Sequence, residues 1–218
     1  MTFVTPAGIG DIAASLLGRP LSARDGWSTR TLEQVEKRLG RELPTALRDF
    51  HRLVGRVERF TSGFEEFLPL DKLMLLDDKL LFLDENQGVC QWGVDDAGQV
   101  WQLLDSAPEW HKEEPGQRSI EDFIRVLLYY QLAQGGYRYA SMFAPGANDA
   151  IPNEAVFLSS VDWPVVIDTD GLHIRQRDTA LLWHLKDHGE PSDGVFISCL
   201  RRSQLDALLK AFPLDDLT

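Results

Sequence analysis

The sequence predicts an α+β fold in which a mixed or antiparallel sheet is flanked by helices. Three observations predict it. Two helical patterns joined by a short turn occupy residues 29–55, short apolar runs bounded by turn residues fill 67–104, and a further helical pattern covers 119–135. Apolar residues at helical spacing indicate amphipathic helices, whereas short apolar runs between Gly, Asn and Asp indicate strands. The length of 218 residues suits one domain that spans 1–218.

The first helices have recognisable start and stop signals. A short helix is predicted over residues 9–17, ending at Gly18. The next begins near Thr29, where Thr31 and Gln34 fit a capping box, and it ends at Gly40. Its partner opens at Pro44 and carries an apolar face up to a stop at residue 55; that face consists of Leu47, Phe50 and Val54. Together the second and third helices form a helical hairpin.

The following stretch predicts antiparallel strands. The apolar runs are 67–70, 73–76, 80–83, 89–94 and 99–104. Residues 95–98 read DDAG, which is typical of a tight hairpin turn with glycine at the strained position. Strands joined by so short a connection pair antiparallel.

A strong helix and a second β region complete the chain. Ser119 is the expected cap, Glu121 and Asp122 suit the positive end of the helix dipole, and Gly135-Gly136 ends the helix. Further strands are expected at 155–158, 165–167, 172–174 and 195–200, followed by a closing helix at 205–212. Residues 135–153 resemble a linker, so that the segment 136–218 completes or extends a core formed by 29–135.

The charge is concentrated in one part of the chain. The net charge is −12, and residues 65–122 alone hold 15 acidic and 4 basic residues. Such a field repels nucleic acid and phospholipid head groups and attracts a basic partner, which makes a nucleic-acid or membrane ligand unexpected. A merely solubilising surface is the alternative interpretation.

The composition predicts a cytoplasmic protein. No apolar run approaches the length needed to cross a bilayer, and the first residues lack the basic start of a signal peptide. Cys90 and Cys199 have neither metal-ligand nor disulfide-framework spacing, which suits a reducing compartment.

No catalytic, cofactor or metal motif is found. His184 and His188 stand four residues apart, but Leu185 replaces the glutamate of a zinc-protease helix. Residues 8–13 read GIGDIA, a loose dinucleotide-binding pattern, yet Pro6 interrupts the strand that should precede it. Residues 168–171 read DTDG, which a hairpin turn explains without calcium. We therefore expect no enzyme and no cofactor; an enzyme with an unrecognised site stays open.

Three motifs in order resemble the SUKH superfamily, which includes fungal cell-wall regulators and many bacterial immunity proteins. Residues 36–44 read EKRLGRELP, similar to the family's opening helical hairpin. Residues 81–94 read LFLDENQGVCQWGV, similar to its sheet segment, and Trp101, Trp110 and the helix from Ser119 follow in the family's order. The resemblance covers residues 29–135, about half of the chain. Val54-Gly55-Arg56 departs from the family's Asn-Gly turn.

The resemblance implies a SUKH-like, non-enzymatic fold that presents one face to a protein. For bacterial members the partner is a toxin domain, so the chain is expected to be a cytosolic immunity protein that neutralises a basic, nuclease-type toxin. The alternative is a regulatory or scaffold protein of the same fold with an endogenous partner. Trp92 is expected in the core, whereas Trp110 is expected in an exposed loop. The predicted partner-binding residues are Asp95, Asp96, Trp101, Asp105, Glu109, Trp110, Glu113 and Glu114.

Overall fold

The fold is α+β, as the sequence predicts. The computed structural model describes residues 8–112, 119–146 and 151–218. Within these ranges it contains seven α-helices and two antiparallel six-stranded sheets. The strands therefore divide into two sheets, where the sequence analysis had considered one.

The predicted helical hairpin is confirmed. A first helix α1 (Ile9–Leu17) ends at Gly18, and the hairpin consists of α2 (Thr29–Leu39) and α3 (Thr45–Val54). A short helix α4 (Glu58–Thr61) follows. The expected capping box is wrong by three residues, because Ser28 is the cap of α2 and its side chain accepts a hydrogen bond from the Thr31 backbone N–H.

The first sheet contains the predicted central strands and one that was not predicted. Its strands run in the order β1-β3-β4-β5-β6, with β2 paired to β3. Their bounds are β1 (Glu66–Phe67), β2 (Met74–Leu76), β3 (Lys79–Asp84), β4 (Cys90–Val94), β5 (Val100–Leu104) and β6 (Ala107–Lys112). Strand β6 was expected to be a loop, since it contains Pro108 and polar residues; as an edge strand it tolerates both.

The predicted long helix joins the two sheets. Helix α5 (Ile120–Gln131) is capped by Ser119, which accepts from the Asp122 N–H, and it passes into a π-helical turn η1 (Leu132–Gly136). The second sheet runs in the order β12-β7-β11-β10-β9-β8. Its strands are β7 (Tyr139–Phe143), β8 (Val165–Asp168), β9 (Leu172–Arg177), β10 (Ala180–Asp187), β11 (Glu190–Cys199) and β12 (Leu214–Asp216), and its helices are α6 (Glu154–Ser160) and α7 (Arg202–Ala211).

Two predictions for the C-terminal segment are wrong. The apolar run at 155–158 lies in helix α6, where the Asn153 side chain caps the Val156 N–H; four apolar residues are too few to separate a strand from a helix. The linker-like stretch contains strand β7, which is paired on both sides by β11 and β12. Its pairing partners lie more than 50 residues ahead in the sequence, so no local pattern indicates it.

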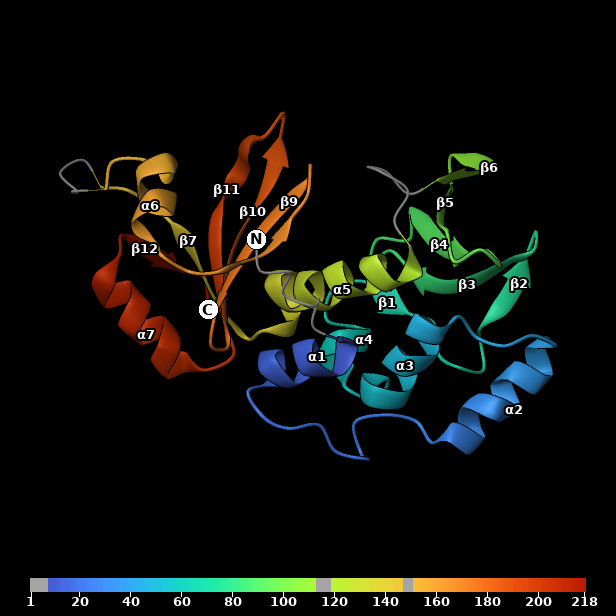
Figure 1. Cartoon of the computed structure of the whole chain (residues 1–218). Helices are drawn as coiled ribbons and strands as arrows, with labels where there is room; N and C mark the ends of the chain where they lie inside the picture. Colours follow the sequence, from blue (N-terminus) through green and yellow to red (C-terminus); the bar gives the residue numbers. More distant parts are fainter. Residues whose placement is uncertain (1–7, 113–118, 147–150) are drawn as a thin grey trace, which may run out of the picture.

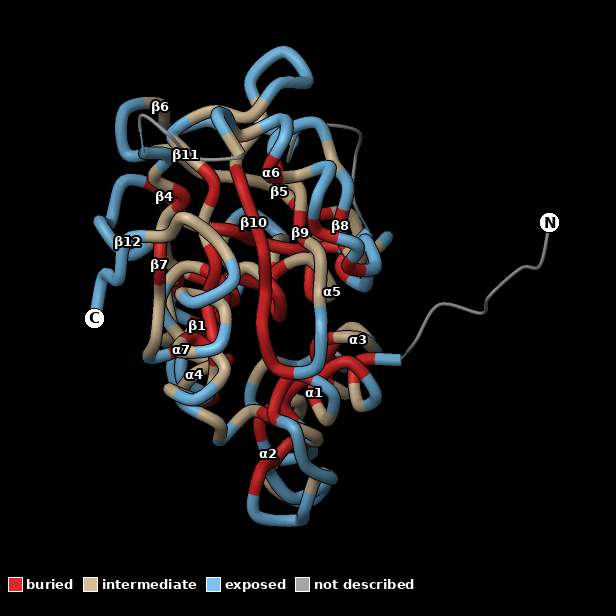
Figure 2. Tube along the Cα trace, turned by 90° about the vertical axis from the view of Figure 1, so that its left-hand side faces the viewer, coloured by how far each residue is buried: buried red, intermediate tan, exposed pale blue. Residues whose placement is uncertain are grey.

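Helix α5 lies between the two sheets, with α1, α3 and α4 beside it (Figure 1). Phe50, Phe82 and Ile124 from the first part of the chain belong to the same buried cluster as Ile174 and Leu181 of the second sheet. The opposite face of the second sheet packs a separate cluster against α6 and α7. Figure 2 shows β10 buried along most of its length and the connecting turns exposed. No helix in the described ranges is long and apolar enough to span a membrane.

Candidate protein-binding face

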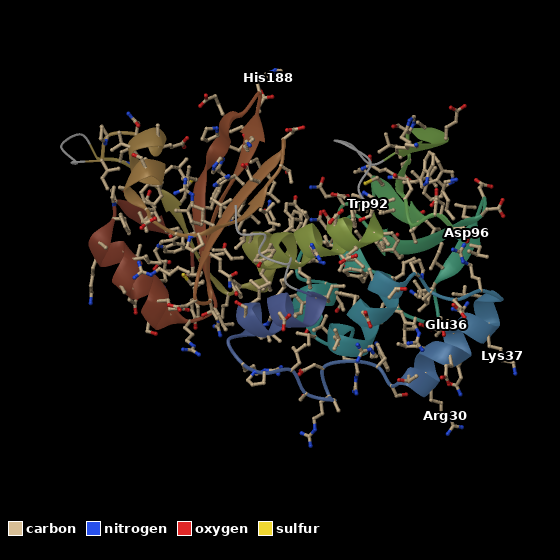
Figure 3. The ribbon with its side chains drawn as sticks, in the orientation of Figure 1. Arg30, Glu36, Lys37, Trp92, Asp96 and His188 are labelled. Carbon is tan, nitrogen blue, oxygen red and sulfur yellow. The ribbon has the colours of Figure 1, made fainter. Side chains whose placement is uncertain are left out.

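Two tryptophans lie on the outer face of the first sheet. Along β4, Trp92 points inward, where it is 8% exposed and contacts Phe123 of α5, so the next residue, Gly93, faces outward (Figure 3). Gly93 pairs with Trp101 of β5, and a Cβ atom at Gly93 would lie 2.7 Å from the Trp110 ring. The missing side chain therefore lets the Trp110 ring approach the sheet closely at Gly93. We call Lys79, Gly93, Trp101 and Trp110 the tryptophan face.

Lys79 joins the two indole rings. Its Nζ atom lies 4.8 Å from the centroid of the Trp101 ring and 5.3 Å from that of the Trp110 ring. Lys112 approaches Trp101 from β6 at 5.4 Å. An ammonium over an indole face is stabilised by the ring quadrupole, by about 0.5–1 kcal/mol where water has access. The two rings are thus held around a shared cation.

Aspartates fix the orientation of both indoles. The Trp101 Nε1–H donates to Asp95 Oδ2 at 2.8 Å, while Asp95 Oδ1 accepts from the Gln99 backbone N–H at 2.9 Å. The Trp110 Nε1–H donates to Asp77 Oδ2 at 3.3 Å. Hydrogen bonds of this kind satisfy the one polar atom of each tryptophan and leave its rings for apolar contact.

Acidic residues gather at the same end of the sheet as these bonds. Because Leu80 pairs with Val94, the β2–β3 turn with Asp77 and Asp78 lies beside the β4–β5 turn with Asp95 and Asp96. Of the eight acidic residues between residues 74 and 112, these four lie at this end of the sheet, while the two lysines of the same stretch, Lys79 and Lys112, lie over the Trp101 ring. The turns that border the tryptophan face at this end are therefore strongly negative.

The predicted partner-binding residues fall into three groups. Asp95 and Trp101 are bonded to each other, and Asp96 pairs with Arg41 at 2.6 Å while its own side chain stays 87% exposed. Asp105 and Glu109 are exposed and, within the described ranges, carry no ion pair. Glu113 and Glu114 lie outside the described residues.

The prediction for Trp110 is corrected in one respect. It lies on strand β6 and is partly buried, because Gly93 leaves room for its ring; it is not in an exposed loop. The face also contains or contacts three residues that were not predicted from the sequence, namely Lys79, Asp77 and Gly93. A glycine inside a strand pattern signals a close approach of another group, and this signal could have identified Gly93.

A buried carboxyl lies between the first sheet and α5. Glu65 is 6% exposed, and its Oε2 accepts from the Asn86 backbone N–H at 2.9 Å. Burial raises the pKa of Glu65 to about 7. Next to it, the buried Gln131 side chain accepts from the backbone N–H groups of Phe64 and Glu65 and donates to the Phe60 and Glu65 carbonyls.

The two histidines that were considered as metal ligands differ in exposure, because His184 is buried and His188 is exposed. His184 is 5% exposed, donates through Nδ1 to the Leu185 carbonyl and stacks on His173, with ring centroids 5.1 Å apart. His188 is at the exposed tip of the β10–β11 hairpin (Figure 3). In the part of the chain that the structure describes, no three His, Cys, Asp or Glu residues come together as a metal site.

Comparisons of this chain with known protein families, with curated proteins and with solved structures found no match. The SUKH resemblance thus depends on the three sequence motifs alone.

Proposed function

We propose that this protein is a SUKH-type binding module without catalytic chemistry of its own, and that its tryptophan face docks on a basic protein. The observation that carries the proposal is the pair Trp101 and Trp110, held side by side and partly exposed inside an acidic border. Tryptophan is enriched among the few residues that supply most of the binding energy at protein interfaces. Charged borders add association rate and selectivity.

The face is preorganised for such a contact. Each indole has its N–H bonded to an aspartate, and Lys79 lies between the rings, so the side chains lose little rotamer freedom on binding. The exposed Asp96 and Asp105, in the turns at the two ends of β5, are available to cationic groups of a partner. A basic surface is therefore the favoured complement.

The resemblance supports a more specific proposal, in which the partner is a bacterial toxin and this protein is its cytosolic immunity protein. The chain has, in order, the hairpin α2–α3, antiparallel strands and the capped helix α5, which is the order that the resemblance implies. A nuclease-type toxin is basic because it binds phosphates, and an acidic surface would occupy that site. No step of bond making is assigned to this chain.

The experiment captures a partner and then maps the face. Purified proteins encoded by neighbouring genes are passed over the immobilised full chain, and association rates are measured at low and physiological salt. The test variant is Asp96→Lys with Asp105→Lys, at exposed positions of the turns at the two ends of β5. The control is Asp170→Lys with Glu190→Lys, which changes the charge equally at exposed residues of the second sheet.

The proposal expects the test variant to slow association by about tenfold at low salt and the control by less than about twofold. It also expects the parent chain to protect cells that express the captured toxin. Equal effects of the two variants would remove the tryptophan face as the docking surface. Capture of an endogenous housekeeping protein, without protection from any toxin, would replace immunity by the regulatory or scaffold role.

A further inference from the structure

A cavity of about 720 Å³ lies on another part of the molecule, between α2 and the segment 61–71. Its volume falls within the range of small-molecule sites. The apolar walls come from Trp27, Val35, Phe67 and Leu70. None of these residues belongs to the tryptophan face.

The walls are held in place by the chain itself. Arg38 of α2 donates to the Leu70 carbonyl at 2.8 Å and to the Leu73 carbonyl at 3.0 Å, which fixes the opening between helix and segment. Phe67 stacks on Phe50 with ring centroids 4.0 Å apart. The cavity is therefore already formed without a ligand.

Trp27 closes one side because glycine allows the approach. Its Nε1–H donates to the Gly55 carbonyl at 2.9 Å, and its backbone N–H donates to the His51 carbonyl at 2.9 Å. A Cβ atom at Gly55 would lie 2.9 Å from the Trp27 ring and 2.7 Å from the His51 backbone. A larger residue at position 55 would push Trp27 away from the cavity.

The buried polar side chain in the wall is uncharged. His51 is 3% exposed, and no described residue hydrogen-bonds either of its ring nitrogens. Burial lowers the pKa of His51 to about 4, so the imidazole is neutral at pH 7. A buried polar group without a partner is uncommon in proteins and often marks a functional position.

The charges of the cavity are confined to its mouth. Arg38, Glu66 and Asp71 are the charged lining residues, and all three are exposed. Their signs are mixed, and the rest of the lining is apolar or uncharged, with Thr31, Gln34, Thr61 and Ser62 as its other polar residues besides His51. An ionised group placed inside would lose its hydration without gaining a counter-charge.

We propose that this cavity is a binding site for an uncharged, largely apolar small molecule, aromatic or aliphatic in body. The site is independent of the tryptophan face and of the proposed function. Ligand enters between α2 and the segment 61–71, packs on Val35 and Phe67, and lies beside His51.

The test uses two probes with one aromatic frame. N-phenyl-1-naphthylamine is neutral at pH 7, whereas 8-anilino-1-naphthalenesulfonate carries a sulfonate on the same frame; both fluoresce when they leave water. The neutral probe is expected to bind the full chain saturably at one site, and the sulfonate to bind at least about tenfold more weakly.

A matched pair of variants locates the site. Gln34 and Lys37 are both exposed on α2, but only Gln34 lines the cavity, while Lys37 points outward from the helix (Figure 3). Gln34→Trp should obstruct the mouth and weaken binding of the neutral probe at least about tenfold, and Lys37→Trp should change it less than about twofold. In the parent chain the His51 ring protons should shift on addition of the neutral probe.

Three results would each overturn the proposal. They are the absence of saturable binding, equal affinity for the two probes, and a His51 resonance that the neutral probe leaves unmoved. Equal effects of Gln34→Trp and Lys37→Trp on binding of the neutral probe would place the probe elsewhere on the surface and would overturn the proposal as well. Because no partner protein is used, none of these results bears on the tryptophan face.

Discussion

Glu65 should make the stability of this protein depend on pH near neutrality. Its pKa is about 7 in the folded chain, against an ordinary value of 4.5. The unfolded chain therefore loses the Glu65 proton at lower pH than the folded chain does. The stabilisation from the neutral carboxyl is complete below pH 4.5 and is lost as the pH rises through 7.

The size of the effect follows from the difference between the two pKa values. One pKa unit corresponds to about 1.4 kcal/mol, so ionising Glu65 inside the folded protein costs about 3 kcal/mol above pH 7. At pH 5 the Glu65 carboxyl is neutral in the folded chain and only partly ionised in the unfolded chain, so the cost is below about 1 kcal/mol. Glu65→Gln removes the titration and keeps an oxygen that can accept from the Asn86 N–H.

Urea unfolding of the parent and of Glu65→Gln at pH 5 and pH 8, followed by tryptophan fluorescence, measures this cost. The advantage of the variant in unfolding free energy should grow by about 2 kcal/mol between the two pH values. Glu66→Gln, at the exposed neighbouring position, is the control and should show no such growth. An advantage that is the same at both pH values would refute the argument that burial holds this carboxyl neutral.

Three further substitutions test the contact at Gly93, the cap of helix α5 and the hydrogen bonds of the buried Gln131. Gly93→Ala should place a Cβ against the Trp110 ring and lower the unfolding free energy by about 1–3 kcal/mol, with a red shift of tryptophan emission; unchanged emission would contradict the close contact. Ser119→Ala removes the cap of the Asp122 N–H and should cost about 1 kcal/mol in a thermal melt. Gln131→Leu leaves four buried backbone groups without their hydrogen-bond partner, and it should lower the unfolding free energy in urea by at least about 3 kcal/mol. An unfolding free energy close to that of the parent would show that other groups satisfy them.

Elements with local signals were predictable from the sequence. The α2–α3 hairpin is defined by apolar spacing and by stops at Gly40 and Gly55, and α5 by its Ser119 cap. The β4–β5 hairpin is defined by its DDAG turn, and the inward position of Trp92 by strand alternation. Each of these features depends on residues a few positions apart.

Elements that depend on distant partners were not predictable. Strand β7 exists because β11 and β12 pair with it, and β6 because β5 offers a free edge. The error at α6 has a different origin, because its short apolar run fits both a helix and a strand and the local cap at Asn153 was not recognised.

The sequence by itself determined the α+β class, the acidic character of residues 65–122 and the two tryptophans of the candidate face. Only the tertiary structure brought Lys79 between Trp101 and Trp110, turned Asp77 and Asp95 to their indoles, and enclosed the cavity at His51. The physical reason is that helix and turn preferences act over a few residues, whereas register, cross-strand contact and burial join residues far apart in the chain.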